Sequence, residues 1–190
     1  MIMVKNGLII LLLSSIISCN SGFTDKERSE YLKNGKEIAT NSFKELSTQL
    51  TTQMEAGGPA QAIPFCKAEA LNILGELSEK HNAIIKRSSD QLRSCKIGPT
   101  HRELDVINMY KQLVSEKKEL NPIIEIDAAN KKHFYAPIIM QAKCLTCHGE
   151  VNKTMTVKTD SIIKSIYPFD IATGYREGDV RGVWSITFNK

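Results

Sequence analysis

The chain has 190 residues, of which 42% are apolar and 24% are charged, and its formal net charge at pH 7 is +4. This length and composition predict one globular domain with a real core and exclude a disordered or fibrous protein. The charge is mild and no dense basic run with interleaved aromatic residues occurs, so we expect no nucleic-acid partner.

The first 18 residues predict an export signal. Lys5 gives a positive start, and the apolar run from Leu8 is too short to span a bilayer permanently. The run ends in Ile-Ile-Ser before Cys19, which resembles a bacterial lipobox, where cleavage leaves the cysteine as a lipidated N-terminus. The alternative is a plain secretory signal with an incidental cysteine. We therefore expect a periplasmic protein anchored to the membrane through lipid on Cys19, with a tether over 19–24 and a single domain over 25–190.

Two helical patterns follow the tether. Apolar residues recur at steps of three to five over 25–56, which predicts a helix of about 45 Å that either bends or projects as a stalk. Gly57-Gly58-Pro59 ends it, because glycines stop a helix and proline suits the first turn of the next one. The second helix covers 59–80, with a kink expected at Pro64.

The remaining chain alternates strands with shorter helices. Thr100 and Glu103 form a capping-box pattern, which predicts a helix start. Strands are expected at 84–88, at 122–127 and 133–140 as a hairpin, and at 180–188 as a half-buried strand. Between the last two strands we expect a helix at 160–167 and a loop at 168–179. Helices first, then strands with helices among them, predict an α+β fold with an antiparallel sheet.

The chain carries one strong chemical motif, Cys144-Leu-Thr-Cys147-His148. Its C-x-x-C-H spacing is typical of covalent attachment of a c-type haem, because two thiols three positions apart can each add to one vinyl group and the histidine then lies under the iron. Zinc is an alternative, but a structural zinc site needs further nitrogen or sulfur ligands. The spacing of the two cysteines also suits a redox-active pair or a simple disulfide.

Several other side chains are possible partners of such a haem. Cys66 is either an axial ligand or a small buried apolar residue, and the other candidates for the sixth coordination position are His101, His133 and Met140. We expect Cys95 to be a lone thiol, with pairing to Cys66 in the haem-free protein as the alternative. The guanidinium groups that suit haem propionates are those of Arg87, Arg93 and Arg181.

The segments KKHFYAPIIMQAKCLTCHG, IYPFDIATGYREGDVRGVWSITF, EAGGPAQAIPFCKAEA and RSSDQLRS resemble a bacterial family of c-type haem-binding domains, usually described as a domain of unknown function. The resemblance covers about 24–188. It implies a PAS-like antiparallel sheet flanked by helices, thioether bonds at Cys144 and Cys147, and His148 as proximal ligand. It also implies that Cys66 can be the second axial ligand through its thiolate.

Two protein ligands would leave no vacant position on the iron, which argues against oxygenase or peroxidase chemistry at rest. We therefore expect a mono-haem cytochrome for electron transfer or redox sensing, working with a redox partner or a sensor partner. The alternatives are a sensor of NO or CO and a small haem reductase or peroxidase. PAS-like domains often pair through an N-terminal helix, so a homodimer is a further expectation.

Overall fold

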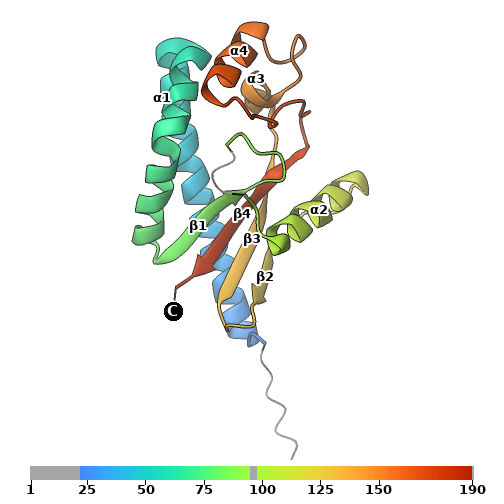
Figure 1. Cartoon of the computed structure of the whole chain (residues 1–190). Coiled ribbons are helices and arrows are strands. Elements are labelled where there is room, and N and C mark those ends of the chain that lie inside the picture. Colours follow the sequence, from blue (N-terminus) through green and yellow to red (C-terminus); the bar gives the residue numbers. More distant parts are fainter. Residues whose placement is uncertain (1–21, 95–97, 190) are drawn as a thin grey trace, which may run out of the picture.

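The computed structural model describes residues 22–94 and 98–189, built around one antiparallel sheet (Figure 1). The predicted signal segment, Cys19 and Cys95 lie outside the described residues. The strands follow the order β1-β4-β3-β2, with bounds β1 Ala83–Ser88, β2 Ile123–Ile126, β3 Lys132–Ile139 and β4 Val180–Phe188. All three pairings are antiparallel. The predicted α+β class, with an antiparallel sheet, flanking helices and a long N-terminal helix, is confirmed.

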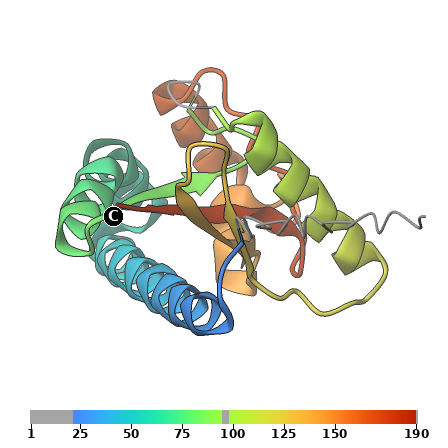
Figure 2. The same cartoon turned by 90° about the horizontal axis from the view of Figure 1, so that it is seen from below.

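The long helix α1 (Asp25–Lys80) consists of two arms that lie against each other as a hairpin (Figures 1 and 2). The direction changes at Gly57 (φ −166°, ψ 19°) and Gly58 (φ 62°, ψ −155°), the residues with non-helical angles inside α1. The break predicted there is confirmed. Pro64 lies inside the helix without such a departure, so the expected bend belongs to the glycines instead. A projecting stalk is also wrong, because buried residues of both arms pack against the sheet.

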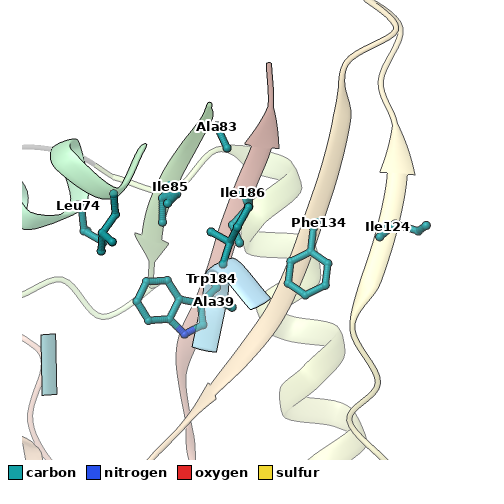
Figure 3. Packing of buried hydrophobic residues seen from close by; sticks show 10 residues of the cluster. Ala39, Leu74, Ala83, Ile85, Ile124, Phe134, Trp184 and Ile186 are labelled. Atoms are coloured by element: carbon teal, nitrogen blue, oxygen red, sulfur yellow. The ribbon is translucent and has the colours of Figure 1, made fainter. Parts of the chain in front are cut away.

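One face of the sheet packs against α1. Figure 3 shows Leu74 and Ala39 of α1 beside Ile85, Phe134, Trp184 and Ile186 of the sheet. Trp184 therefore packs in the core. The contact with the first arm is close, because a Cβ at Gly35 would overlap the Phe134 ring.

The other face packs against α2 (His101–Ser115). The predicted capping box is confirmed: Thr100 Oγ1 accepts from Glu103 N, and the Glu103 carboxylate accepts from Thr100 N. Helices on both faces bury the central strand β4 over most of its length, so the expectation of a half-buried strand is wrong. The apolar contacts on this face come from Val106, Ile107, Tyr110, Tyr135, Val180 and Val183.

Short helices gather beyond the far end of β3: η1 (Ala142–Cys144), α3 (Leu145–His148) and α4 (Val157–Ile166) (Figure 1). α4 begins three residues before the predicted start, because the Thr156 hydroxyl caps it by accepting from Thr159 N at 3.1 Å. Ile63 of α1 packs with Met155 and Ile163, which fixes α4 against the second arm. In the described part of the chain, no helix has the length and apolar character needed to cross a membrane.

Candidate functional site

The C-x-x-C-H motif forms a single helical turn directly after β3. Cys144 ends η1, and Cys147 and His148 lie on α3. Gly149 ends the turn by donating its N–H to Leu145 O at 2.9 Å. A Cβ at Gly149 would overlap Thr154 Oγ1 and approach Leu145 O to 2.6 Å, so only glycine fits at the position that follows the motif.

The imidazole of His148 is held through Nδ1. This atom lies 2.7 Å from the carbonyl oxygen of Ala172 and 2.9 Å from Nη2 of Arg93. Burial, followed by the positive charges of Arg93 and Arg181, lowers the pKa of His148 well below its ordinary value. The ring is therefore neutral at pH 7, and a neutral imidazole whose Nδ1–H donates to a carbonyl keeps the Nε2 lone pair for a metal.

The loop that follows α4 is joined to the motif by backbone hydrogen bonds. Tyr175 N donates to His148 O at 3.0 Å, and Gly174 N donates to Gly149 O at 2.9 Å. Gly174 has φ of 82°, which favours glycine. The Tyr175 ring meets the His148 ring edge-on, with centroids 6.3 Å apart.

Cys66 lies on the face of the second α1 arm that packs beside the motif. Ile63, one turn earlier on that face, belongs to the same apolar cluster as Cys147. Burial raises the pKa of the Cys66 thiol, while the charges of Arg87 and Arg93 act in the opposite direction. Cys66, Cys144 and Cys147 are all free thiols.

The three predicted arginines lie near this site but have different contacts. Arg93 donates through Nη2 to Cys147 O (2.6 Å) and Ala172 O (3.1 Å), and its Nε faces Asp170 Oδ1 at 3.6 Å. Arg181 hydrogen-bonds Ser89 Oγ and Gln91 O and lies over the Tyr175 ring.

Arg87 differs from the other two. Its side chain has no hydrogen bond or ion pair to any other described residue, and it is exposed. Nevertheless the surrounding protein desolvates it enough to lower its pKa, and the nearby Cys66 opposes that shift. Because the guanidinium of Arg87 has no acceptor among the described residues, its donors are available for an anion.

The structure separates the other ligand candidates. His133 lies at the start of β3, at the opposite end of the strand from the motif, and its ring contacts Asp127 and Thr187. The fold therefore does not bring this candidate sixth ligand to the motif. His101 is exposed at the start of α2. Met140 is buried beside Cys144, Leu145 and Tyr175 and is the one of these three that the fold brings to the motif.

Sequence reasoning missed three parts of the site. Asp170 supports Arg93, Ala172 supplies a carbonyl, and Tyr175 packs on the histidine. Asp170 had no signal in the sequence, because the apolar residues on both sides of it, Phe169 and Ile171, are themselves exposed. A backbone carbonyl such as that of Ala172 leaves no signal in the sequence.

The donors at this end of the sheet suit a covalently attached haem. Two free thiols have the required spacing, a neutral histidine keeps Nε2 available, a third thiol lies close by and Arg87 has free donors. Among the described residues, no group of three or more His, Cys, Asp or Glu side chains is arranged to hold a metal ion, so the further ligands of a zinc site are not found there.

Comparison with known proteins places the chain in a family. It matches the model of the Tll0287-like family over residues 24–189, most of its length, and it belongs to that family. Among solved structures it is similar to the cyanobacterial heme-protein Tll0287, with a TM-score of 0.57 and 19% sequence identity, covering 88% of this chain and 98% of that one. At this identity the likeness shows a shared fold. The comparison with curated proteins finds no match.

Proposed function

We propose that the protein is a mono-haem c-type cytochrome. Cys144 and Cys147 form the thioether bonds and His148 is the proximal iron ligand. The observation that carries this proposal is the hydrogen bond between His148 Nδ1 and Ala172 O, which leaves Nε2 available in a motif whose two thiols are free and correctly spaced. The relative with the same fold is itself described as a heme-protein.

Cys66 is the proposed second axial ligand. Its position near Cys147 supports this role, and the positive charge of Arg87 opposes the rise in thiol pKa that burial causes. Arg87 is also the arginine best placed for a haem carboxylate, because Arg93 and Arg181 are engaged by the protein. When bound, the haem supplies a one-electron couple, and thiolate ligation favours its ferric state.

With both positions filled by protein ligands, the proposed activity is electron transfer or redox sensing. The proposed setting is the periplasm, with the chain anchored through lipid on Cys19 and exchanging electrons or a conformational signal with a partner protein. A carrier keeps both ligands on reduction, whereas a sensor loses the Cys66 thiolate.

The test is absorption spectroscopy of the exported protein produced with c-type haem maturation, oxidised and reduced, for wild type, Cys66→Ala and the cysteine control Cys95→Ala. A Soret band that survives acid-acetone extraction is expected for all three. A shift of the ferric spectrum towards high spin is expected for Cys66→Ala alone. Absence of covalent haem in the wild type would refute the proposal, and an unshifted Cys66→Ala spectrum would remove Cys66 from the ligand set and favour Met140.

A further inference from the structure

Arg93 and Asp170 join three chain segments behind the ring of His148. Arg93 comes from the loop after β1, His148 from α3 and Asp170 from the loop after α4. The Asp170 carboxylate is 2% exposed, and the Arg93 side chain is 15% exposed. A buried ion pair needs further hydrogen bonds to offset its desolvation, and here they come from the groups around His148.

Both hydrogens of Arg93 Nη2 have carbonyl acceptors. Cys147 O lies at 2.6 Å and belongs to the peptide bond that leads into His148, and Ala172 O lies at 3.1 Å. The imidazole therefore keeps its own hydrogen on Nδ1 and directs it to Ala172 O at 2.7 Å. If Arg93 donated to Nδ1 instead, the ring hydrogen would lie on Nε2, and that nitrogen could not bind a metal.

Asp170 fixes the carbonyl that receives this hydrogen. Its Oδ1 accepts the N–H of Ala172 at 3.0 Å and faces Arg93 Nε. The peptide groups on both sides of Ala172 are thus held, one through its N–H and the other through its C=O. The carboxylate, the guanidinium and the imidazole all meet at this residue.

We propose that Arg93 and Asp170 are positioning residues that hold the His148 ring with Nδ1–H on Ala172 O and Nε2 turned to the iron, and that Arg93 does not bind a haem carboxylate. Arg93 contacts the Nδ1 edge of the ring, so it lies behind the ligand as seen from the metal. This inference rests on the proposed haem function, although its statement about the histidine tautomer concerns the protein alone.

The first test measures the tautomer of His148 by ¹⁵N NMR of the haem-free full chain under reducing conditions. Wild type should show the Nδ1–H tautomer, and Arg93→Gln and Asp170→Asn should each show a mixture with the Nε2–H form. Arg102→Gln is the control, because Arg102 also pairs with a carboxylate, that of Glu125, but on the surface of α2 and β2 and without contact with His148. An unchanged tautomer in both site variants would overturn the proposal.

The second test measures the ferric-to-ferrous ratio of the haem-loaded protein at a fixed solution potential and pH 8. Loss of the positive charge in Arg93→Gln should raise this ratio about tenfold, equivalent to about 59 mV for a one-electron couple, and loss of the negative charge in Asp170→Asn should lower it by a similar factor. The double variant should lie within about threefold of wild type. Arg93→Lys should also stay near the wild-type ratio while losing tautomer order, because an ammonium lacks the planar fork.

Opposite shifts report the two charges, whereas a lost ring position acts in the same direction in both variants. Arg93→Lys separates the two effects, because it keeps the charge and loses the planar fork. A wild-type tautomer in Arg93→Lys would therefore overturn the proposal. If wild type acquires no covalent haem, the proposed function fails, and the NMR measurement still decides whether Arg93 and Asp170 set the tautomer.

Discussion

At the scale of single residues, the arginines around the motif divide by what they contact. Arg93 and Arg181 donate to carbonyls and side chains of the protein, whereas the side chain of Arg87 has no such partner among the described residues. A guanidinium that supports the fold should be needed with or without haem. One that waits for an anionic ligand should be needed only with it.

This difference predicts opposite behaviour of two variants. Arg93→Gln should destabilise the haem-free protein by about 3 kcal/mol, because it leaves the Asp170 carboxylate buried without its charge partner. Arg87→Gln should leave the haem-free stability nearly unchanged but lower the yield of haem-loaded protein several-fold. Urea unfolding of the haem-free chain and the haem content of exported protein measure the two effects. Equal destabilisation by both variants would contradict the division.

The sequence marks the proposed reacting groups of the site, but it does not mark the residues that support them. Cys144, Cys147 and His148 are recognisable because their chemistry demands a fixed spacing along the chain. The contacts of His148 with Arg93 and Ala172 join residues 55 and 24 positions away, and one of them uses a backbone atom. Such contacts depend on how the loops meet in space, which no local pattern records.

At the scale of elements, α1 contains glycines with different roles. Gly35 lies where the first arm meets Phe134, and a Cβ there would overlap the ring. A Cβ added at Gly75, on the second arm, would meet no neighbouring atom within 4 Å. The helical interior otherwise favours alanine over glycine at both positions.

Substitution of each glycine by alanine should therefore have opposite signs. Gly35→Ala should lower the free energy of unfolding by about 1–3 kcal/mol, because Phe134 must move out of a closely packed position. Gly75→Ala should raise it by about 0.5–1 kcal/mol through helix propensity alone. Chemical denaturation of the two variants beside wild type measures both. A stabilising Gly35→Ala would mean that α1 does not lie this close to β3.

The cap of α2 has a charge that links the helix to the sheet. Burial alone would raise the pKa of Glu103, but hydrogen bonds from Lys86, the Thr100 backbone and Ser88 outweigh it and lower the pKa below its ordinary value. A carboxyl with a lowered pKa in the folded state stabilises the protein above its unfolded pKa. That stabilisation disappears as the pH falls through the folded value.

Glu103→Gln should accordingly lower the free energy of unfolding by about 1–3 kcal/mol at pH 7. The difference from wild type should shrink as the pH falls from about 5 to 3, where the wild-type carboxyl also becomes neutral. The matched control is Glu27→Gln, at the same position of the exposed capping box of α1, where a smaller effect is expected. A difference that stays constant from pH 7 to pH 3 would show that the charge of Glu103 is not the cause. Denaturant unfolding across this pH range gives the answer.

Locally coded elements were predicted closely and packing was not. The α2 capping box, the β2–β3 hairpin and the Gly57–Gly58 break all follow from residues adjacent in the chain. The burial of β4 on both faces and the return of α1 onto the sheet depend on which elements meet. The periodicity of a helix indicates which of its faces is apolar, but it does not indicate which other element packs against that face.

At the scale of the whole molecule, the start of α1 and the candidate site lie at opposite ends (Figure 1). Tyr31, near the start of α1, contacts Phe188 at the end of β4, with ring centroids 4.8 Å apart. Phe188 is paired with Lys132 at the start of β3, and the motif follows the other end of that strand. A lipid anchor at Cys19 would therefore hold the end of the molecule that lies away from the site.

The lipid anchor itself has a direct test. Cys19→Ala should move the protein from the membrane fraction to the soluble fraction, or leave the signal uncleaved. The mass spectrum of wild type should show the added mass of a lipidated N-terminus. A tether of residues 20–24 reaches at most about 18 Å, so the anchored domain would remain next to the membrane. A soluble wild type with a free Cys19 would refute the anchor without affecting the proposed haem site.

If the anchor holds, the site should face away from the membrane and remain open to a soluble partner. We expect a soluble redox protein to reduce the haem-loaded protein at similar rates when it is anchored in vesicles and when it is released by removal of residues 1–21. The comparison needs stopped-flow kinetics at one ionic strength, because partner charge also changes association rates. A rate at least tenfold slower in the anchored form would mean that the membrane covers the site. The expectation that the site faces away from the membrane would then be wrong.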